Sequence, residues 1–156
     1  MARALVGLAV LLAGCGLASR DFDVEQTFQA GGGPPGFSGS IDSAKLTGPL
    51  SGDVSKISSI TLKAARIEAT DGNGDISFIS QANISVSSRL VADALLASLA
   101  SPVPPGASSV QLQINPKELK PSLQAGGTVS ANISYSPTPV TARALKLVLT
   151  LHGSLL

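Results

Sequence analysis

The chain has few of the residues that most often build small-molecule sites. Its 156 residues include one cysteine, one histidine, one tyrosine, four phenylalanines and no tryptophan. A lone cysteine cannot form an internal disulfide, so stability must come from a packed core. Sugar rings and unpaired bases are commonly held on aromatic faces, and the scarcity of aromatic side chains counts against both ligand classes.

Charge is also scarce and is evenly balanced. Eleven lysines and arginines face ten acidic residues, which gives a formal net charge of +1. Such a balance provides no broad basic surface for DNA, RNA or an anionic bilayer. We therefore expect no nucleic-acid partner.

The first fifteen residues have the organisation of an export signal. Arg3 precedes an apolar run over residues 4–13, which is too short to span about 30 Å of hydrocarbon as a helix. The run ends in Leu12-Ala13-Gly14-Cys15, which resembles the lipobox of bacterial lipoproteins. The resemblance implies cleavage before Cys15 and a diacylglycerol on its sulfur. A secretory signal that holds a cysteine by chance and a buried apolar helix are the alternatives, and the position of the only cysteine favours the lipoprotein.

This resemblance sets the expected organisation of the chain. Residues 1–14 form the signal peptide, residues 15–20 form a lipidated tether, and residues 21–156 form a single domain. Gly16, where aspartate would mark inner-membrane retention, resembles the sorting state of outer-membrane lipoproteins. The implied location is the outer membrane, facing the periplasm, with Cys15 as the contact to the membrane and an envelope protein as the partner.

The remaining sequence is dominated by apolar residues at alternate positions. Phe22, Val24 and Phe28 alternate with polar residues, which is typical of a half-buried strand. Short segments split by Gly, Pro, Ser and Asn repeat the pattern at residues 37–41, 76–78, 84–86, 110–114 and 129–135. We predict an all-β, mainly antiparallel fold, an immunoglobulin-like two-sheet β-sandwich with one or two short helical turns.

Two longer segments change phase. In residues 57–69 the apolar parity switches after Leu62, and in residues 140–152 it switches after Ala142. A slip of one residue turns every later side chain to the opposite face, so each switch predicts a bulge or a strand that crosses between sheets.

The helical turns are expected in two places. Residues 88–100 fit both a helix and a strand, and we favour a short helix because alanine and leucine are good helix formers. A second turn is predicted at residues 117–123, ended by Gly126-Gly127. Residues 81–87 and 130–136 also share five of seven residues, which fits either equivalent strands of two sheets or drift in a Ser- and Ala-rich chain; we favour drift.

No catalytic constellation is visible. A Ser-His-acid site needs a base beside its nucleophile. The only histidine, His152, shares strand parity with Lys146 and Thr150 and is expected on the exposed side of a strand. Cys15 cannot act as a nucleophile because lipidation uses its sulfur. Asp21, Asp23 and Glu25 fall on one strand face, which we interpret as solvated.

Two glycine-rich stretches invite a ligand interpretation. Residues 31–36 match G-x-G-x-x-G, but Pro34-Pro35 and a following strand supply no helix for a pyrophosphate. Residues 71–75, Asp-Gly-Asn-Gly-Asp, have calcium-ligand spacing, yet Ile76 and Ala82 replace the glycine and glutamate of an EF-hand. A hairpin turn is the favoured interpretation and calcium the alternative.

The sequence thus predicts Cys15 as the lipidation site and no catalytic, cofactor or metal residue. The leading hypothesis is a membrane-anchored, non-enzymatic binding or structural module. The alternative is a tethered carrier of an apolar ligand such as a lipid, suggested by the leucines at 145–151. A hydrolase built from Asp, Glu, Ser and Lys is the third and least favoured hypothesis.

Overall fold

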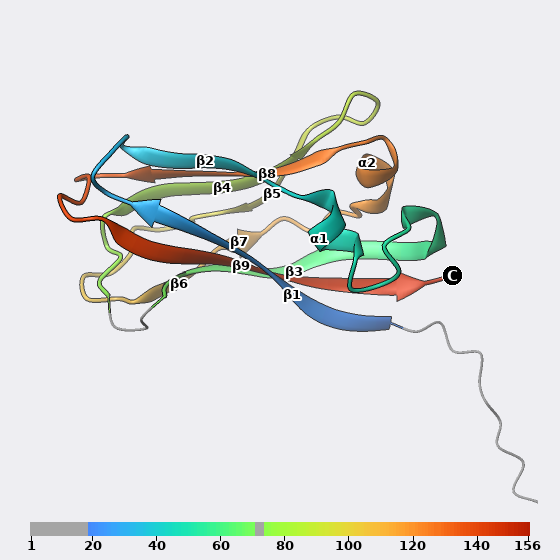
Figure 1. Cartoon of the computed structure of the whole chain (residues 1–156), viewed down its shortest axis with the longest axis horizontal. Helices are drawn as coiled ribbons and strands as arrows, with labels where there is room; N and C mark the ends of the chain where they lie inside the picture. The colour runs from blue at the N-terminus through green and yellow to red at the C-terminus, as the bar shows by residue number, and fades with distance from the viewer. Residues whose placement is uncertain (1–18, 71–73) are drawn as a thin grey trace, which may run out of the picture.

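The computed structural model describes residues 19–70 and 74–156, which form a sandwich of two antiparallel sheets (Figure 1). This confirms the predicted all-β sandwich. One sheet has the order β1 (Ser19–Ala30), β9 (Arg143–Leu155), β3 (Ile57–Ala69), β6 (Ser109–Gln111). The other has the order β2 (Gly36–Ile41), β8 (Thr128–Tyr135), β4 (Ile79–Ser87), β5 (Ala94–Ser98), β7 (Gln113–Ile114). The short helices are α1 (Ser43–Thr47) and α2 (Lys120–Gln124), and η1 (Val54–Lys56) is a 3-10 turn.

The strands are paired in a nested order. β1 pairs with β9, β2 with β8, β3 with β6 and β4 with β5, all antiparallel. This nesting of early strands with late ones is the connectivity of a jelly roll, a sandwich of eight strands, to which β7 adds a short edge strand. Immunoglobulin domains pack two sheets in the same way with a different strand order. One result is that both ends of the described chain lie side by side, on β1 and β9.

The leucines of β9 belong to the core. Leu145, Leu147, Leu149 and Leu151 alternate along the strand and are at most 2% exposed. They pack in one buried cluster with inward residues of the opposite sheet such as Ile84. This packing accounts for the apolar run that suggested a carrier.

One of the two predicted phase changes is confirmed. The register of β3 against β9 shifts between Leu62 and Ala64, so β3 has a bulge where the apolar parity switches. The other prediction is wrong. β9 begins at Arg143 and pairs residue for residue with β1, whereas Val140 and Ala142 lie in the preceding loop.

The helix predicted in residues 88–100 is also wrong. Strand β5 occupies that region between β4 and β7, with Leu96 and Ala97 buried. Pairing with β4 and β7 satisfies backbone hydrogen-bonding groups of β5, and this pairing outweighs the local preference for a helix. The turn predicted at residues 117–123 is confirmed as α2, and Gly126 follows it with a φ of 70°.

The sandwich is elongated along its strands and has two different ends (Figure 1). At the tether end lie Ser19 at the start of β1, the end of β9, and α1, η1 and α2. Strand β1 begins at Ser19, two residues before Asp21, where the domain was expected to start. The loop end carries residues 31–35, Thr70, residues 74–78, 99–108 and 136–142.

Candidate functional site

The outer face of the four-stranded sheet carries a network of cross-strand ion pairs. At the tether end, Nδ1 of His152 lies 2.6 Å from Oδ1 of Asp21, and Nζ of Lys63 lies 3.4 Å from Oδ2 of the same carboxylate. The register of β1 against β9 places Asp21 directly opposite His152. The hydrogen bond from His152, and then that from Lys63, lowers the pKa of Asp21.

A second cluster lies further along the same face. Nζ of Lys146 is 3.1 Å from Oε1 of Glu25 and 3.2 Å from Oε1 of Glu68, whose Oε2 is 2.9 Å from Nε of Arg66. The hydrogen bond to Glu25, and then that to Glu68, raises the pKa of Lys146, while the bond from Arg66 lowers the pKa of Glu68. Val148 of β9 stands between the strand positions Glu25 and Arg66 on this outer face. Its side chain is fully buried there, although it does not belong to the core between the two sheets.

These contacts complete the acidic face expected on β1. Asp21, Asp23 and Glu25 are exposed as predicted, and each has a partner that the local sequence does not indicate. Asp23 accepts a hydrogen bond of 2.6 Å from the hydroxyl of Thr150. All three pair with β9, more than a hundred residues along the chain, and no short-range pattern could identify such partners.

His152 lies where the strand parity predicted, on the outward side of β9 with about a third of its side chain exposed. Asp21 orients its imidazole, which is one half of what a Ser-His-Asp arrangement requires. The other half is a hydroxyl or thiol within about 3 Å of the second ring nitrogen. Among the residues described, no such group is hydrogen-bonded to His152, and we interpret its contact with Asp21 as a structural hydrogen bond beside the ion pairs.

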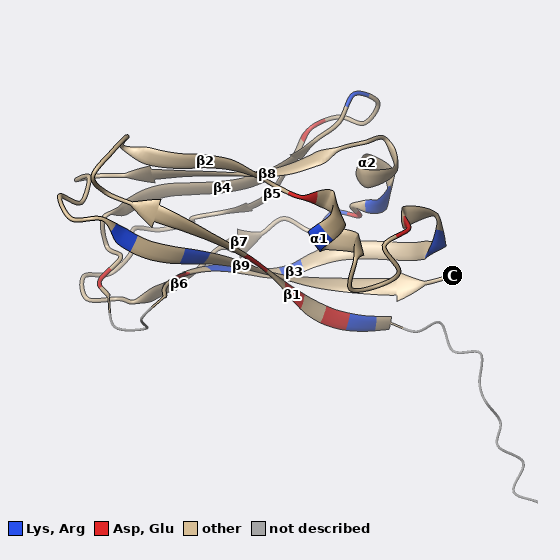
Figure 2. Cartoon of the chain, in the orientation of Figure 1, with Lys and Arg blue, Asp and Glu red and all other residues tan. Residues whose placement is uncertain are grey.

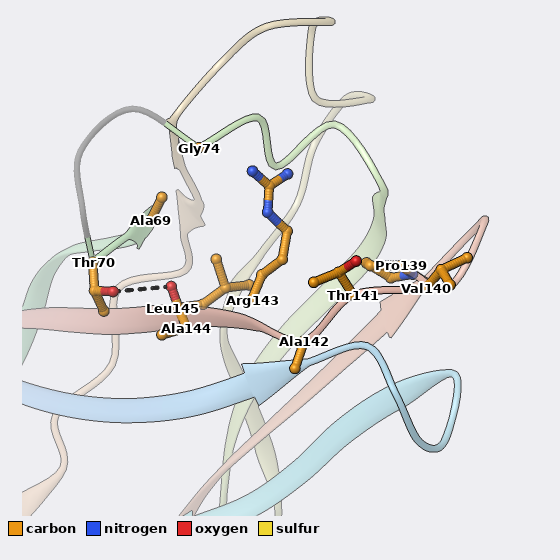
Figure 3. Close-up of a pocket in the computed structure, with 10 residues that line it drawn as sticks. All are labelled: Ala69, Thr70, Gly74, Pro139, Val140, Thr141, Ala142, Arg143, Ala144 and Leu145. Atoms are coloured by element: carbon orange, nitrogen blue, oxygen red, sulfur yellow. Dashed lines mark hydrogen bonds between the residues drawn. The ribbon is translucent and has the colours of Figure 1, made fainter.

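The loop end holds an open cleft of about 550 Å³ (Figure 3). Its walls are the loop before β9, the first residues of β9, and the end of β3 with Thr70 and Gly74. The backbone N–H and the hydroxyl of Thr70 each donate to the carbonyl of Ala144 over 3.2 Å. Nη1 of Arg143 donates to the carbonyl of Asp75 over 2.7 Å. Val140, on the rim, is 96% exposed.

The cleft combines one cation with small apolar side chains. Arg143 extends from β9 toward the segment at Gly74, and Val140 and Thr141 line the opposite wall (Figure 3). Among the described lining residues, Arg143 is the only one with an ionisable side chain.

The calcium alternative falls on this end of the molecule, and residues 71–73 lie outside the described residues. Oδ1 of Asp75 accepts the backbone N–H of Ser77 over 2.8 Å, and this bond is the main reason why the pKa of Asp75 is lowered. Its carboxylate thus closes a local turn at Asp75–Ser77. The predicted hairpin is wrong, because the segment joins β3 to β4, and these two strands belong to different sheets. In residues 19–70 and 74–156, no group of three or more His, Cys, Asp or Glu side chains could hold a metal ion.

The formal dinucleotide motif at residues 31–36 leads into a strand. Gly31 and Gly33 lie in a loop, and Gly36 begins strand β2, as the sequence predicted.

The lipidation residue itself, Cys15, lies outside the described residues, as do the proposed signal peptide and the first part of the tether. Comparison of the chain with protein-family models and with curated protein sequences gives no match. None of the helices within the described ranges is long and apolar enough to cross a membrane.

Proposed function

We propose that this chain is the precursor of an exported lipoprotein, anchored in the outer membrane through Cys15, whose jelly roll is a non-enzymatic binding or structural module. The observation that carries this proposal is the Leu12-Ala13-Gly14-Cys15 segment at the end of an apolar run, with strand β1 starting four residues after Cys15. Two or three acyl chains at one cysteine anchor a domain stably where a single chain does not.

The architecture fits such an anchor. Four residues from Cys15 to Ser19 span at most roughly 14 Å, so the tether end stays close to the bilayer. The twelve residues of β1, at about 3.3 Å each, place the loop end roughly 40 Å farther along the sandwich. The cleft beside Arg143 and Val140 is then available to an envelope protein on the side away from the anchor.

The anchor is tested by expressing the full chain and its Cys15→Ser variant in a bacterium that processes lipoproteins. We expect the wild type in the outer-membrane fraction, released only by detergent, and Cys15→Ser absent from that fraction. Ser19→Ala, which leaves the cysteine in place, serves as the control and should fractionate like the wild type. A wild-type protein that is soluble in the periplasm would contradict the proposal.

The binding role is tested with the lipidated protein as bait in native envelope. We expect a partner that is retained by the wild type and lost with Val140→Asp, which puts a charge on the cleft rim. Leu90→Asp is the matched control, because Leu90 is 85% exposed on a different loop. Equal retention by both variants would show that the cleft is not the contact surface.

A further inference from the structure

The two sheets differ sharply in the charge of their strands (Figure 2). β1, β3 and β9 carry lysine, arginine and carboxylate side chains, whereas β2, β8, β4, β5 and β7 carry none. The outward side chains of the five-stranded sheet are mostly short hydroxyls and amides. One apolar side chain stands among them, Leu95 of β5, which lies opposite Ser85 and is 44% exposed. We define the neutral face by its outward residues Ser38, Ser40, Asn83, Ser85, Asn132 and Ser134.

The centre of the neutral face is built from the repeated segments 81–87 and 130–136. They form neighbouring antiparallel strands of one sheet, which rules out equivalent places in two sheets. Asn83 stands directly opposite Asn132, and the hydroxyl of Ser38 lies 2.7 Å from Oδ1 of Asn132. The centre of the face is therefore polar, and one hydrogen bond there joins side chains of β2 and β8.

Charge restricts what can cover the neutral face. A charged partner surface would lose its water there without gaining a counter-charge, which is costly. The neutral face of a second copy meets this condition because it is uncharged and carries both donors and acceptors. The five strands are two to nine residues long and hold 30 residues in all. At about 3.3 Å per residue and about 4.8 Å between strands they give roughly 500 Å² for each copy, well below the ~800 Å² of a stable interface. Association in solution is therefore expected to be weak.

Anchoring to a membrane strengthens this association, and this step depends on the proposed function. Copies tethered to one bilayer have a raised effective concentration, which strengthens a weak contact without any new interaction. A two-fold axis along the strands brings two neutral faces together and leaves both tether ends on the same side. Pairing of two β2 edges requires an axis normal to the sheet, which puts the tether ends on opposite sides. One bilayer can hold only the first arrangement.

We propose that the neutral face is a self-association surface, through which two anchored copies pack face to face with Asn83 and Asn132 at the centre. The dimer is isologous, so each copy contributes the same surface. It leaves the ion-pair network of the other sheet and the loop-end cleft of both copies free for other partners.

The test uses the mature chain with an N-terminal hexahistidine tag in place of Cys15, bound to vesicles that contain nickel-chelating lipid. Asn132→Cys then supplies the only thiol, and a short bismaleimide reports its proximity to a second copy. We expect at least tenfold more cross-linked dimer than for Gln29→Cys, an exposed position on β1, and a loss of the dimer when the protein is diluted on the vesicle surface.

A second substitution tests whether the neutral face itself makes the contact. Asn83→Lys, added to Asn132→Cys, should abolish the cross-link because two lysines would meet at the centre, whereas Thr27→Lys on the other sheet should not. Equal cross-linking at Gln29→Cys, or a dimer that survives Asn83→Lys, overturns the proposal. The proposal is also overturned if the chain stays monomeric and sediments with an insoluble neutral polysaccharide. That result would assign the neutral face to glycan binding. The tag bypasses lipidation, so an unmodified Cys15 in the native protein would refute the anchor alone.

Discussion

Tyr135 is the most informative side chain for testing the packing of the sandwich. It is 5% exposed, and its ring lies edge-on to Phe78 with 5.6 Å between centroids. Its hydroxyl is buried without a hydrogen-bond partner among the described residues. Burial raises the pKa of Tyr135 to about 12. A buried hydroxyl without a partner costs roughly 1–3 kcal/mol relative to one in water.

Tyr135→Phe removes this hydroxyl and keeps the ring. We expect the free energy of unfolding to rise by about 1 kcal/mol, toward the low end of that range because the lost oxygen leaves a small gap. For a domain of this size, the same change raises Tm by roughly 3–5 °C. Urea unfolding followed by far-UV circular dichroism measures it, and Tyr135→Leu, which loses the aromatic packing, should be less stable than the wild type. A Tyr135→Phe variant that is less stable than the wild type would show that the hydroxyl has a partner and would refute the reasoning.

The same residue predicts a dependence on high pH. Because the pKa is higher in the folded chain than the ordinary value of 10.0, the unfolded chain loses its proton first as the pH rises. The contribution to stability is complete below pH 10 and is lost as the pH rises toward about 12. Tyr135 is the only tyrosine and tryptophan is absent, so the absorbance of phenolate reports this group alone. Tyr135→Phe should lack this loss, and a tyrosine that titrates near 10 in the folded protein would contradict the burial.

Three further changes test other parts of the structure by urea unfolding. Gly31→Ala should lower the free energy of unfolding by about 1–3 kcal/mol, because Gly31 has a φ of 95° and an added Cβ would lie 2.6 Å from the carbonyl oxygen of Pro139. Gly33→Ala is the control and should be near neutral, because a Cβ there would meet no atom within 4 Å. Glu68→Gln should cost about 0.2–1 kcal/mol at pH 7. The pKa of Glu68 lies below its ordinary value, so this difference should be present above pH 4.5 and disappear as the pH falls; a difference that persists in acid would contradict the ion pair. Leu147→Ala, at a fully buried position, should cost about 2–5 kcal/mol, and a smaller loss would indicate a loosely packed core.

Local patterns in the sequence predicted most of the strands and one bulge. The strand predicted at residues 76–78 is wrong, because that segment lies in the turn before β4. Alternation at Phe22, Val24 and Phe28 follows directly from a strand with one buried face, and the phase change after Leu62 follows from the two-residue period. The same reasoning failed where a segment fits two periods, as at β5. It also failed where apolar residues of a loop precede a strand in the opposite parity, as at Val140 before β9.

The strand order and the ion-pair network could not be predicted in this way. Both depend on pairing between β1 and β9, and the contact of Asp21 with His152 joins residues 131 positions apart. A side-chain pattern indicates which face a residue takes but not which strand lies beside it. In the sequence, the only sign of the neutral face is the repeat of Ala-Asn-Ile-Ser. The repeat forms one surface only because β4 and β8 are neighbours in the sheet.

Intact mass spectrometry of the native protein from its envelope shows whether Cys15 carries the covalent lipid on which the proposed location depends. We expect a chain that begins at Cys15 and carries the mass of a diacylglyceryl thioether, with or without a further acyl group on the new amine. A chain that retains residues 1–14, or one that has an unmodified thiol at Cys15, would contradict it.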